Sequence, residues 1–346
     1  MGKPLAITMG DAAGIGPEII AKAFRQAPEL TRGCFVVGDA GTLRRAAQLA
    51  GGPGELGLPV ALIDTPAESL GLPPNCLPVL QIEAAPAPVA FGRISPIAGA
   101  MAGRCVIWAA QAALRGEIAA LVTAPLHKEA LAAAGAPFDA FPGHTEMLQA
   151  QAALFLGKQV SEMPVRMMLA NEELRTVLVS IHLSLAAAIA AVTPDKVLET
   201  LRITNTALST ALGRLPRIGV AGLNPHAGEG GLFGREEIEI IAPAIAKARA
   251  QGLDVYGPFA PDTVFMRARS KGGQPGEFDV VVAMYHDQGL IPVKYLGVEK
   301  GVNVTLGLPL VRTSPDHGTA FDIAGTGKAD ASSLIEAIRM ARMLSR

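Results

Sequence analysis

Three histidines each stand within a few residues of the end of a short apolar segment, and imidazoles in that position could hold a metal ion. The segments and the histidines that follow them are 176–181 with His182, 218–223 with His226, and 280–284 with His286. Each segment is long enough for a buried strand and too short for a helix. Polar side chains at the carboxyl ends of strands line the ligand crevice of an open α/β sheet.

Neutral imidazole is the commonest protein ligand of zinc and other late transition metals. Three protein ligands that leave positions open are typical of a catalytic metal site rather than a structural one. The shared placement therefore predicts that His182, His226 and His286 bind one divalent ion. The alternative is three unrelated polar residues at strand ends. Asp287 and Asp262 are candidates for carboxylates that orient the imidazoles.

Strand-like and helix-like segments alternate along the chain, which favours an α/β fold. Strands are expected at residues 6–9, 34–37 and 119–122, besides the three that precede the histidines. Helices are expected at 19–26, 42–49, 97–114, 129–135, 194–212, 235–251 and 332–344. A polar turn at 141–146 should precede a helix from Met147, and Gly289 should interrupt the segment after His286.

The bulk composition excludes several classes of protein. The 346 residues are enough for two lobes, and 50% hydrophobic with 18% charged residues is an ordinary globular balance. A net charge of -1 and 4% aromatics argue against nucleic acid or an anionic membrane as a partner. No apolar segment reaches the ~20 residues of a membrane span. The three cysteines, Cys34, Cys76 and Cys105, are odd in number and have no spacing typical of disulfides, as expected of a protein in the reducing cytoplasm.

Two glycine-containing segments could meet a nucleotide. Gly10, Gly14 and Gly16 lie between a strand and a helix, where they could cradle a phosphate or simply form a tight turn. Their spacing is not that of a dinucleotide fingerprint or a P-loop.

Residues 312–330 resemble the nucleotide-binding loop of isocitrate and isopropylmalate dehydrogenases. That resemblance implies that His317, Gly318, Thr319 and Asp322 hold the adenosine part of NAD or NADP.

Several longer motifs resemble one family in the same order along the chain. They are Met9–Glu18, Gly143–Glu146, Leu223–Gly231, Tyr285–Gly289, Gly301–Pro309 and Arg312–Ser314. They identify a member of the PdxA family of 4-hydroxythreonine-4-phosphate dehydrogenases.

The resemblance implies that the metal ligands are His182, His226 and His286. It implies substrate contacts at His144, Thr145, Lys294, Asn303 and Arg312. His127 and Lys128, also at an expected strand end, are candidates for supporting or phosphate-contacting residues.

The resemblance also implies an architecture. The fold would be the two-lobed isocitrate/isopropylmalate dehydrogenase type, with a cleft between the lobes. Residues 1–135 with 300–346 would form one lobe that includes the nucleotide loop. Residues 136–299 would form the other lobe, with the metal ligands and the dimer interface. Family members are homodimers whose active site borrows residues across that interface.

The implied reaction is metal-dependent oxidation of the secondary hydroxyl of 4-phosphohydroxy-L-threonine by NAD(P)+ with decarboxylation, in pyridoxal phosphate biosynthesis. Zinc, magnesium, manganese and cobalt all remain open as the metal. The base could be Lys294, or Asp287 acting through water. Relatives that oxidise 4-phospho-threonate or -erythronate, or a terephthalate cis-dihydrodiol, are the alternatives within the family.

Two further classes of protein remain open. A metal-dependent hydrolase or aldolase could use three histidines and a Lys/Arg pair, but it has no use for the 317–325 loop. A non-catalytic metal-binding protein would leave Lys294, Asn303 and Arg312 unexplained.

Overall fold

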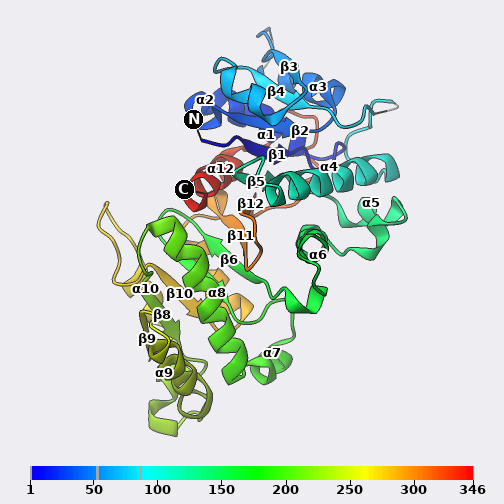
Figure 1. Ribbon diagram of the computed structural model, residues 1–346. Coiled ribbons are helices and arrows are strands. Elements are labelled where there is room, and N and C mark those ends of the chain that lie inside the picture. The colour runs from blue at the N-terminus through cyan, green and yellow to red at the C-terminus, as the bar shows by residue number, and fades with distance from the viewer. Residues whose placement is uncertain (1, 52–53, 86, 346) are drawn as a thin grey trace. The chain divides into compact units, whose positions relative to one another are not determined.

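The chain folds into two compact α/β units, which confirms the expected class (Figure 1). The computed structural model describes residues 2–51, 54–85 and 87–345. The first unit comprises Met1–Pro164 and Leu308–Ser345, and the second comprises Val165–Gly307. The boundaries fall later than the expected 135/136 and 299/300. The first shift arises because Met147 and Leu148 are buried in the core of the first unit.

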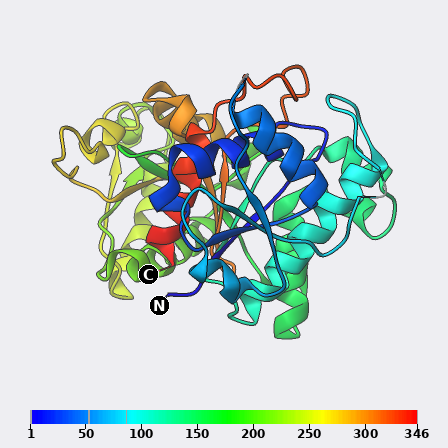
Figure 2. The same ribbon diagram turned by 90° about the horizontal axis from the view of Figure 1, so that it is seen from above.

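The first unit is built on parallel strands in the order β3-β4-β2-β1-β5-β12. Its strands are β1 (Leu5–Thr8), β2 (Cys34–Val37), β3 (Val60–Ile63), β4 (Leu77–Leu80), β5 (Ala120–Thr123) and β12 (Arg312–Pro315). Its helices are α1 (Gly16–Gln26), α2 (Pro28–Thr31), α3 (Ala40–Gly51), α4 (Pro96–Leu114), α5 (Lys128–Ala133), α6 (His144–Leu156) and α12 (Ser332–Leu344). Figure 2 shows α12, in red, beside the blue N-terminal segments of this unit.

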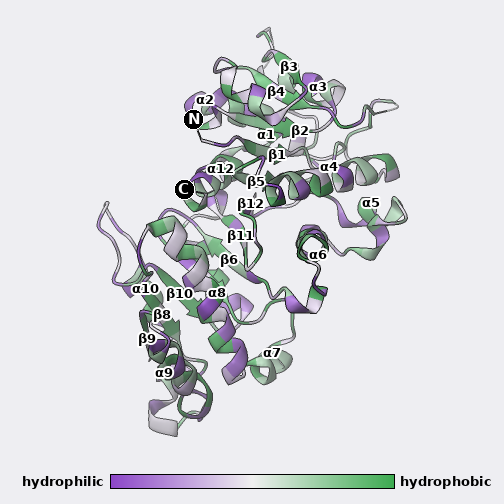
Figure 3. Ribbon diagram, in the orientation of Figure 1, coloured by the Kyte–Doolittle hydropathy of each residue, from purple (hydrophilic) through white to green (hydrophobic). Residues whose placement is uncertain are grey.

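Helix α4 shows how small residues allow close packing in this unit. By its length and its hydropathy (Figure 3) it could cross a membrane. However, 56% of its most apolar 18-residue stretch is buried inside the protein. A Cβ on Gly99 would lie 2.0 Å from the Ala130 carbonyl oxygen, and one on Gly103 would lie 2.4 Å from the Phe138 ring. Glycine at these positions therefore lets α5 and the following turn approach the helix, which packs as a core helix of this unit.

The second unit has strands in the order β11-β6-β7-β10-β8-β9. Its strands are β6 (Arg166–Ala170), β7 (Arg175–Leu178), β8 (Ile218–Ala221), β9 (Val255–Phe259), β10 (Val280–Ala283) and β11 (Val302–Leu306). Its helices are α7 (Leu185–Ala191), α8 (Pro194–Leu212), α9 (Ala242–Ala250), α10 (Val264–Ala268) and α11 (His286–Tyr295). Strand β6 runs antiparallel to both β7 and β11, whereas β7, β10, β8 and β9 are parallel to one another.

The three segments expected as strands before the histidines are β7, β8 and β10, and the structure shows in addition that they are immediate neighbours. Strand β10 pairs in parallel with β7 on one side and with β8 on the other. Their carboxyl ends therefore lie at the same edge of the sheet. The expected interruption at Gly289 is wrong, because α11 continues through that residue. A Cβ on Gly289 would lie 2.4 Å from the Leu178 side chain, so the glycine lets α11 pack directly on β7.

Other helix boundaries differ from expectation by one to three residues, among them the start of α1 at Gly16 rather than at residue 19, and two of the differences concern the site and the helix after it. Helix α6 begins at His144 rather than at Met147, so the expected polar turn contributes its last residues to the first helical turn. The helix expected over 235–251 begins as a π-helix, Glu237–Ile241, and continues as α9. Both differences follow from packing that local sequence does not report.

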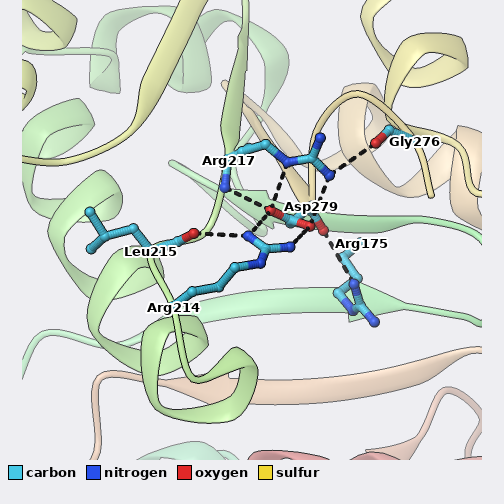
Figure 4. A network of polar contacts seen from close by, with 6 residues as sticks. All are labelled: Arg175, Arg214, Leu215, Arg217, Gly276 and Asp279. Atoms are coloured by element: carbon cyan, nitrogen blue, oxygen red, sulfur yellow. Dashed lines mark hydrogen bonds and ion pairs between the residues drawn. The ribbon is translucent and has the colours of Figure 1, made fainter.

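A cluster around Asp279 ties together the amino ends of β10, β8 and β7 (Figure 4). The Asp279 carboxylate accepts two hydrogen bonds of 2.8 Å from the Arg214 guanidinium and one of 2.8 Å from the Arg217 backbone N–H. Arg175 donates to the Asp279 carbonyl oxygen. Burial raises the pKa of Asp279, but the two guanidinium groups outweigh it and hold that pKa well below its usual range.

Replacing this carboxylate should destabilise the protein. We expect Asp279→Asn to lower the free energy of unfolding by about 1–3 kcal/mol at neutral pH, because charge-assisted hydrogen bonds are lost. The pKa is depressed in the folded state, so the carboxylate stabilises the fold above the unfolded pKa of about 3.9. Its contribution is lost as the pH falls through the lower folded-state value. The urea midpoints of wild type and variant should therefore converge in acid.

The control is Asp139→Asn, which changes an exposed carboxylate of the first unit. It should alter the free energy of unfolding by no more than about 0.5 kcal/mol. Equal effects of the two substitutions at neutral pH would contradict the role of the Asp279 cluster.

Candidate metal and substrate site

His182 and His286 line the same cavity of the second unit, at the edge where β7 and β10 end. The cavity has a volume of about 460 Å³, and the two ring centroids are 5.7 Å apart. Its other lining residues are Ser180, Ile181, Leu183, Leu185, Ala188, Tyr285 and Asp287. The sequence prediction that these two histidines come together is therefore consistent with the geometry of a single copy.

Asp287 orients one of the two imidazoles. His286 Nδ1 and Asp287 Oδ1 are 2.7 Å apart and share a hydrogen bond. Because Nδ1 faces the carboxylate, Nε2 lies on the opposite side of the ring and is the nitrogen that could bind a metal ion. The predicted role of Asp287 in orienting a metal ligand requires such a contact, and the role itself stays a prediction. Asp262 is exposed before α10 and, within the described ranges, makes no hydrogen bond with the predicted histidine ligands. Its orienting role stays a prediction.

Two of the predicted ligands have left-handed backbones. The φ angles of His182 and His226 are 51° and 52°. Residues other than glycine rarely adopt this region, and each instance costs on the order of 1–3 kcal/mol. Such strain persists only where the surrounding structure enforces it, and it concentrates at functional sites.

The turn that carries His226 is held by a glutamate that sequence reasoning missed. All residues from His226 to Gly230 have positive φ. Glu237 is buried, and its Oε1 accepts hydrogen bonds from the backbone N–H groups of Leu223 (2.6 Å) and Asn224 (2.7 Å). The only sequence signal was an acidic residue in the first turn of an expected helix.

His226 does not join the other two histidines within one copy. Its side chain is exposed, and its ring centroid lies 6.2 Å from that of Phe233. Over residues 2–51, 54–85 and 87–345, no three His, Cys, Asp or Glu side chains gather closely enough to hold a metal ion. The donor chemistry of His182 and His286 fits a divalent ion, but a single copy supplies two of the three predicted ligands.

In the first unit, the structure places Arg312 close to His144. The Arg312 side chain is buried, and its Nε and Nη2 donate to Thr123 Oγ1 at 3.0 and 2.8 Å. Burial lowers the pKa of Arg312 to about 10, so the guanidinium keeps its charge at neutral pH. Burial and then the charge of Arg312 lower the pKa of His144 well below its usual range. Thr145, the next residue of α6, is half-buried.

The other two predicted substrate contacts belong to the second unit. Lys294 is exposed in the last turn of α11. Asn303 is half-buried in β11. Each stays a predicted contact.

The predicted nucleotide loop divides into an exposed and an anchored part. His317, Gly318 and Asp322 are exposed, whereas Thr319 is 8% exposed. The Thr319 carbonyl accepts a 3.0 Å hydrogen bond from the Ile15 N–H, so this residue anchors the loop. His127 stacks on Phe321 of the same loop, with ring centroids 4.5 Å apart. The predicted phosphate-contacting Lys128 is exposed at the start of α5.

The glycine-rich turn before α1 has the geometry of a tight turn rather than of a phosphate cradle. Three of its N–H groups already have protein acceptors: Asp11 donates to the Pro125 carbonyl, Ala13 to the Asp11 side chain, and Gly14 to the Asp11 carbonyl. A Cβ on Gly14 would lie 2.9 Å from Thr319. Glycine is therefore needed for close approach to the 317–325 loop. Burial raises the pKa of Asp11 despite the lowering effect of the Ala13 N–H.

Comparison with known proteins gives matches along the whole chain. The profile of the family described as "Pyridoxal phosphate biosynthetic protein PdxA" matches residues 31–341. The 4-hydroxythreonine-4-phosphate dehydrogenase of Beijerinckia indica is 52% identical, over 99% of this chain and 95% of that protein. The D-threonate 4-phosphate dehydrogenase of Salmonella typhimurium is 44% identical, over 99% of each.

Solved structures give the same result. The crystal structure of 4-hydroxythreonine-4-phosphate dehydrogenase from Klebsiella pneumoniae has a TM-score of 0.86 and 43% identity, covering 100% of this chain and 98% of that one. A terephthalate 1,2-cis-dihydrodiol dehydrogenase from Burkholderia xenovorans has a TM-score of 0.67 and 31% identity, covering 99% and 98%. The chain therefore belongs to the PdxA family of pyridoxal phosphate biosynthetic proteins.

Proposed function

We propose that this protein is an NAD(P)-dependent dehydrogenase that oxidises the secondary hydroxyl of 4-phosphohydroxy-L-threonine, with loss of the carboxyl group as carbon dioxide, in the cytoplasm. The observation that carries the proposal is the cavity shared by His182 and His286, with Asp287 orienting His286. Membership of a dehydrogenase family and the exposed loop residues at 317–322 support a nicotinamide as the hydride acceptor.

A second phosphorylated substrate is the main alternative. Relatives named D-threonate 4-phosphate dehydrogenase cover this chain as fully as those named 4-hydroxythreonine-4-phosphate dehydrogenase. Both names specify a phosphorylated hydroxy acid, which favours this substrate class over the dihydrodiol of the more distant relative.

Charged side chains of suitable chemistry are present for such a substrate. We assign Arg312 and Lys294 to its phosphate and carboxylate, because Arg offers a bidentate fork and Lys a point charge. Burial and the charge of Arg312 lower the pKa of His144, which favours its neutral form, and a neutral imidazole would donate or accept a hydrogen bond without adding charge. Thr145 and Asn303 would supply neutral polar contacts.

We assign the metal site to residues of two copies of this chain. His182 and His286 of one copy would supply two ligands, and His226 of the other would supply the third. Exposed apolar side chains surround His182 and support such an interface: Ile181 (37% exposed), Leu183 (51%), Leu185 (58%) and Ile189 (44%). Zinc, magnesium, manganese or cobalt bound there would stabilise negative charge developing on the substrate oxygen.

The protein residues themselves would hold the substrate and move the proton. Arg312 is held in place by Thr123 and would fix the anionic end of the substrate. Asp287 at the cavity wall, acting through a water, or Lys294 would accept the hydroxyl proton as hydride leaves to the nicotinamide. The adenosine end of the cofactor would rest on His317, Gly318 and Asp322.

A direct assay tests the substrate assignment. The metal-supplemented protein should form NADH or NADPH from 4-phosphohydroxy-L-threonine faster than from 4-phospho-D-threonate, 4-phospho-D-erythronate or the terephthalate dihydrodiol. Preference for 4-phospho-D-threonate would move the protein to a catabolic role with the same chemistry. No reduction of either nicotinamide with any of these substrates, with metal bound, would contradict the dehydrogenase assignment.

Subunit mixing tests the shared metal site. Alone, His182→Ala, His226→Ala and His286→Ala should each lose metal and activity while keeping the fold. After random reassociation, a mixture of His182→Ala and His226→Ala should recover about a quarter of wild-type activity, because half of the dimers would each have one intact site.

The matched control is a mixture of His182→Ala and His286→Ala. It should recover nothing, because both ligands come from the same copy. Metal content measured by mass spectrometry should follow activity in both mixtures. Recovery in neither mixture, or in both, would contradict the proposed division of ligands.

A further inference from the structure

A buried ion pair on α1 holds the end of the 317–329 segment. Glu18 and Lys22 are one helical turn apart, with Lys22 Nζ 3.0 Å from Glu18 Oε1. Lys22 Nζ also donates to the carbonyl oxygens of Gly327 (2.7 Å) and Ala329 (2.6 Å). The Glu18 carboxylate accepts from the backbone N–H groups of the same two residues, at 3.3 and 2.9 Å. The two side chains thus satisfy the backbone donors and acceptors of both residues.

The position of this pair makes its hydrogen bonds strong. The Glu18 side chain is 2% exposed and that of Lys22 is 14% exposed, so solvent screening is small. Charge-assisted hydrogen bonds are roughly twice as strong as those between neutral groups. Glu18 is also in the first turn of α1, where the helix dipole favours a negative charge. The ion pair therefore fixes residues 327–329 to the helix.

A second contact fixes the same segment nearer its start. The Thr319 carbonyl accepts a hydrogen bond from the Ile15 N–H, just before α1. Between Thr319 and Gly327 the chain forms local turns, with hydrogen bonds from Ile323 to Ala320 and from Thr326 to Ile323. The loop is thus a short connection whose two ends are both anchored at or near the amino end of α1. Anchoring its ends reduces the number of conformations open to it.

We propose that Glu18 and Lys22 are positioning residues that hold the 317–325 loop in the conformation that binds the adenosine end of the nicotinamide cofactor. This inference rests on the proposed function, which places the cofactor on that loop. The pair has no direct contact with the cofactor in this scheme. It acts by keeping most molecules in the binding-competent loop conformation before the cofactor arrives.

The expected kinetic signature follows from this population argument. A ligand that binds only one conformation has an apparent affinity reduced in proportion to the fraction of molecules in it. We call the Glu18–Lys22 ion pair, with its four hydrogen bonds to Gly327 and Ala329, the clamp. Loss of the clamp should therefore raise KM for the cofactor. Saturating cofactor restores the loop conformation, so kcat and KM for the hydroxy acid should change little. A general loss of fold would lower kcat as well.

The test compares variants of the full-length, metal-supplemented protein. Lys22→Met removes both bonds to the carbonyl oxygens, and the double variant Glu18→Gln/Lys22→Met avoids leaving a buried charge unpaired. Lys22→Arg is the conservative variant that keeps a donor. Arg25→Met is the matched control, because Arg25 is on the same helix but pairs with Glu55.

Without cofactor, hydrogen exchange of peptides covering 320–329 should be faster in Lys22→Met and in the double variant than in wild type. In the same two variants KM for the cofactor should rise at least tenfold, because each variant loses both Lys22 bonds to the carbonyl oxygens and one charge-assisted hydrogen bond alone is worth about a factor of ten. In both, kcat should stay within about twofold of wild type, since chemistry at saturation is untouched. Lys22→Arg should restore most of the loss, and Arg25→Met should match wild type.

Unchanged exchange in both variants, or faster exchange with an unchanged KM, would overturn the inference. A parallel measurement separates this from failure of the proposed function. Calorimetric titration with NAD+ and with NADP+, without substrate, gives the binding affinity whether or not turnover occurs. If wild type binds a nicotinamide, protects 317–325 and is inactive, only the assigned reaction fails, and the variants' weaker binding still supports the clamp. If neither nicotinamide protects 317–325 in wild type, the clamp inference fails.

Discussion

The parallel pairing of β7, β10 and β8 is the constraint on which the candidate metal site depends. Strands β8 and β10 are wholly apolar and buried, and β7 is buried from Thr176 onward, so the charged groups lie at the ends of these strands. At the amino ends, Asp279 and its arginine partners bind the strands together. At the carboxyl ends, the chain emerges into His182, Tyr285 and His286. The amino ends of these strands thus carry the contacts that stabilise the sheet, and their carboxyl ends lead to the candidate metal ligands.

Buried glutamates support two irregular segments that carry candidate site residues. Glu237 accepts hydrogen bonds from backbone N–H groups before the His226 turn, and Glu18 does the same for the segment after the 317–325 loop. Each stands near the start of a helix, where the dipole favours its charge. Because each carboxylate binds backbone rather than ligand, it fixes the path of an irregular segment that no strand or helix could hold.

Much of this arrangement could be predicted from the sequence, for identifiable reasons. The apolar segments before His182, His226 and His286 were predicted as strands and are β7, β8 and β10, and the final helix was predicted at Ser332–Leu344 as observed. Strands such as β9, which contains a glycine and a proline, lacked the pattern and were missed. The course of α11 through Gly289 depends on Leu178, far away in sequence. The direction of His226 depends on consecutive left-handed residues, which propensity does not report.

The left-handed backbones of His182 and His226 mean that two residues of the candidate site lower the stability of the fold. Glycine or asparagine would occupy both positions with less strain. Selection for thermal robustness alone would therefore favour replacing the residues that the site needs. Laboratory evolution or consensus engineering of this chain for heat resistance should consequently hold these two positions fixed. Homologues with a glycine or asparagine there would be candidates for stable proteins that have lost the metal chemistry.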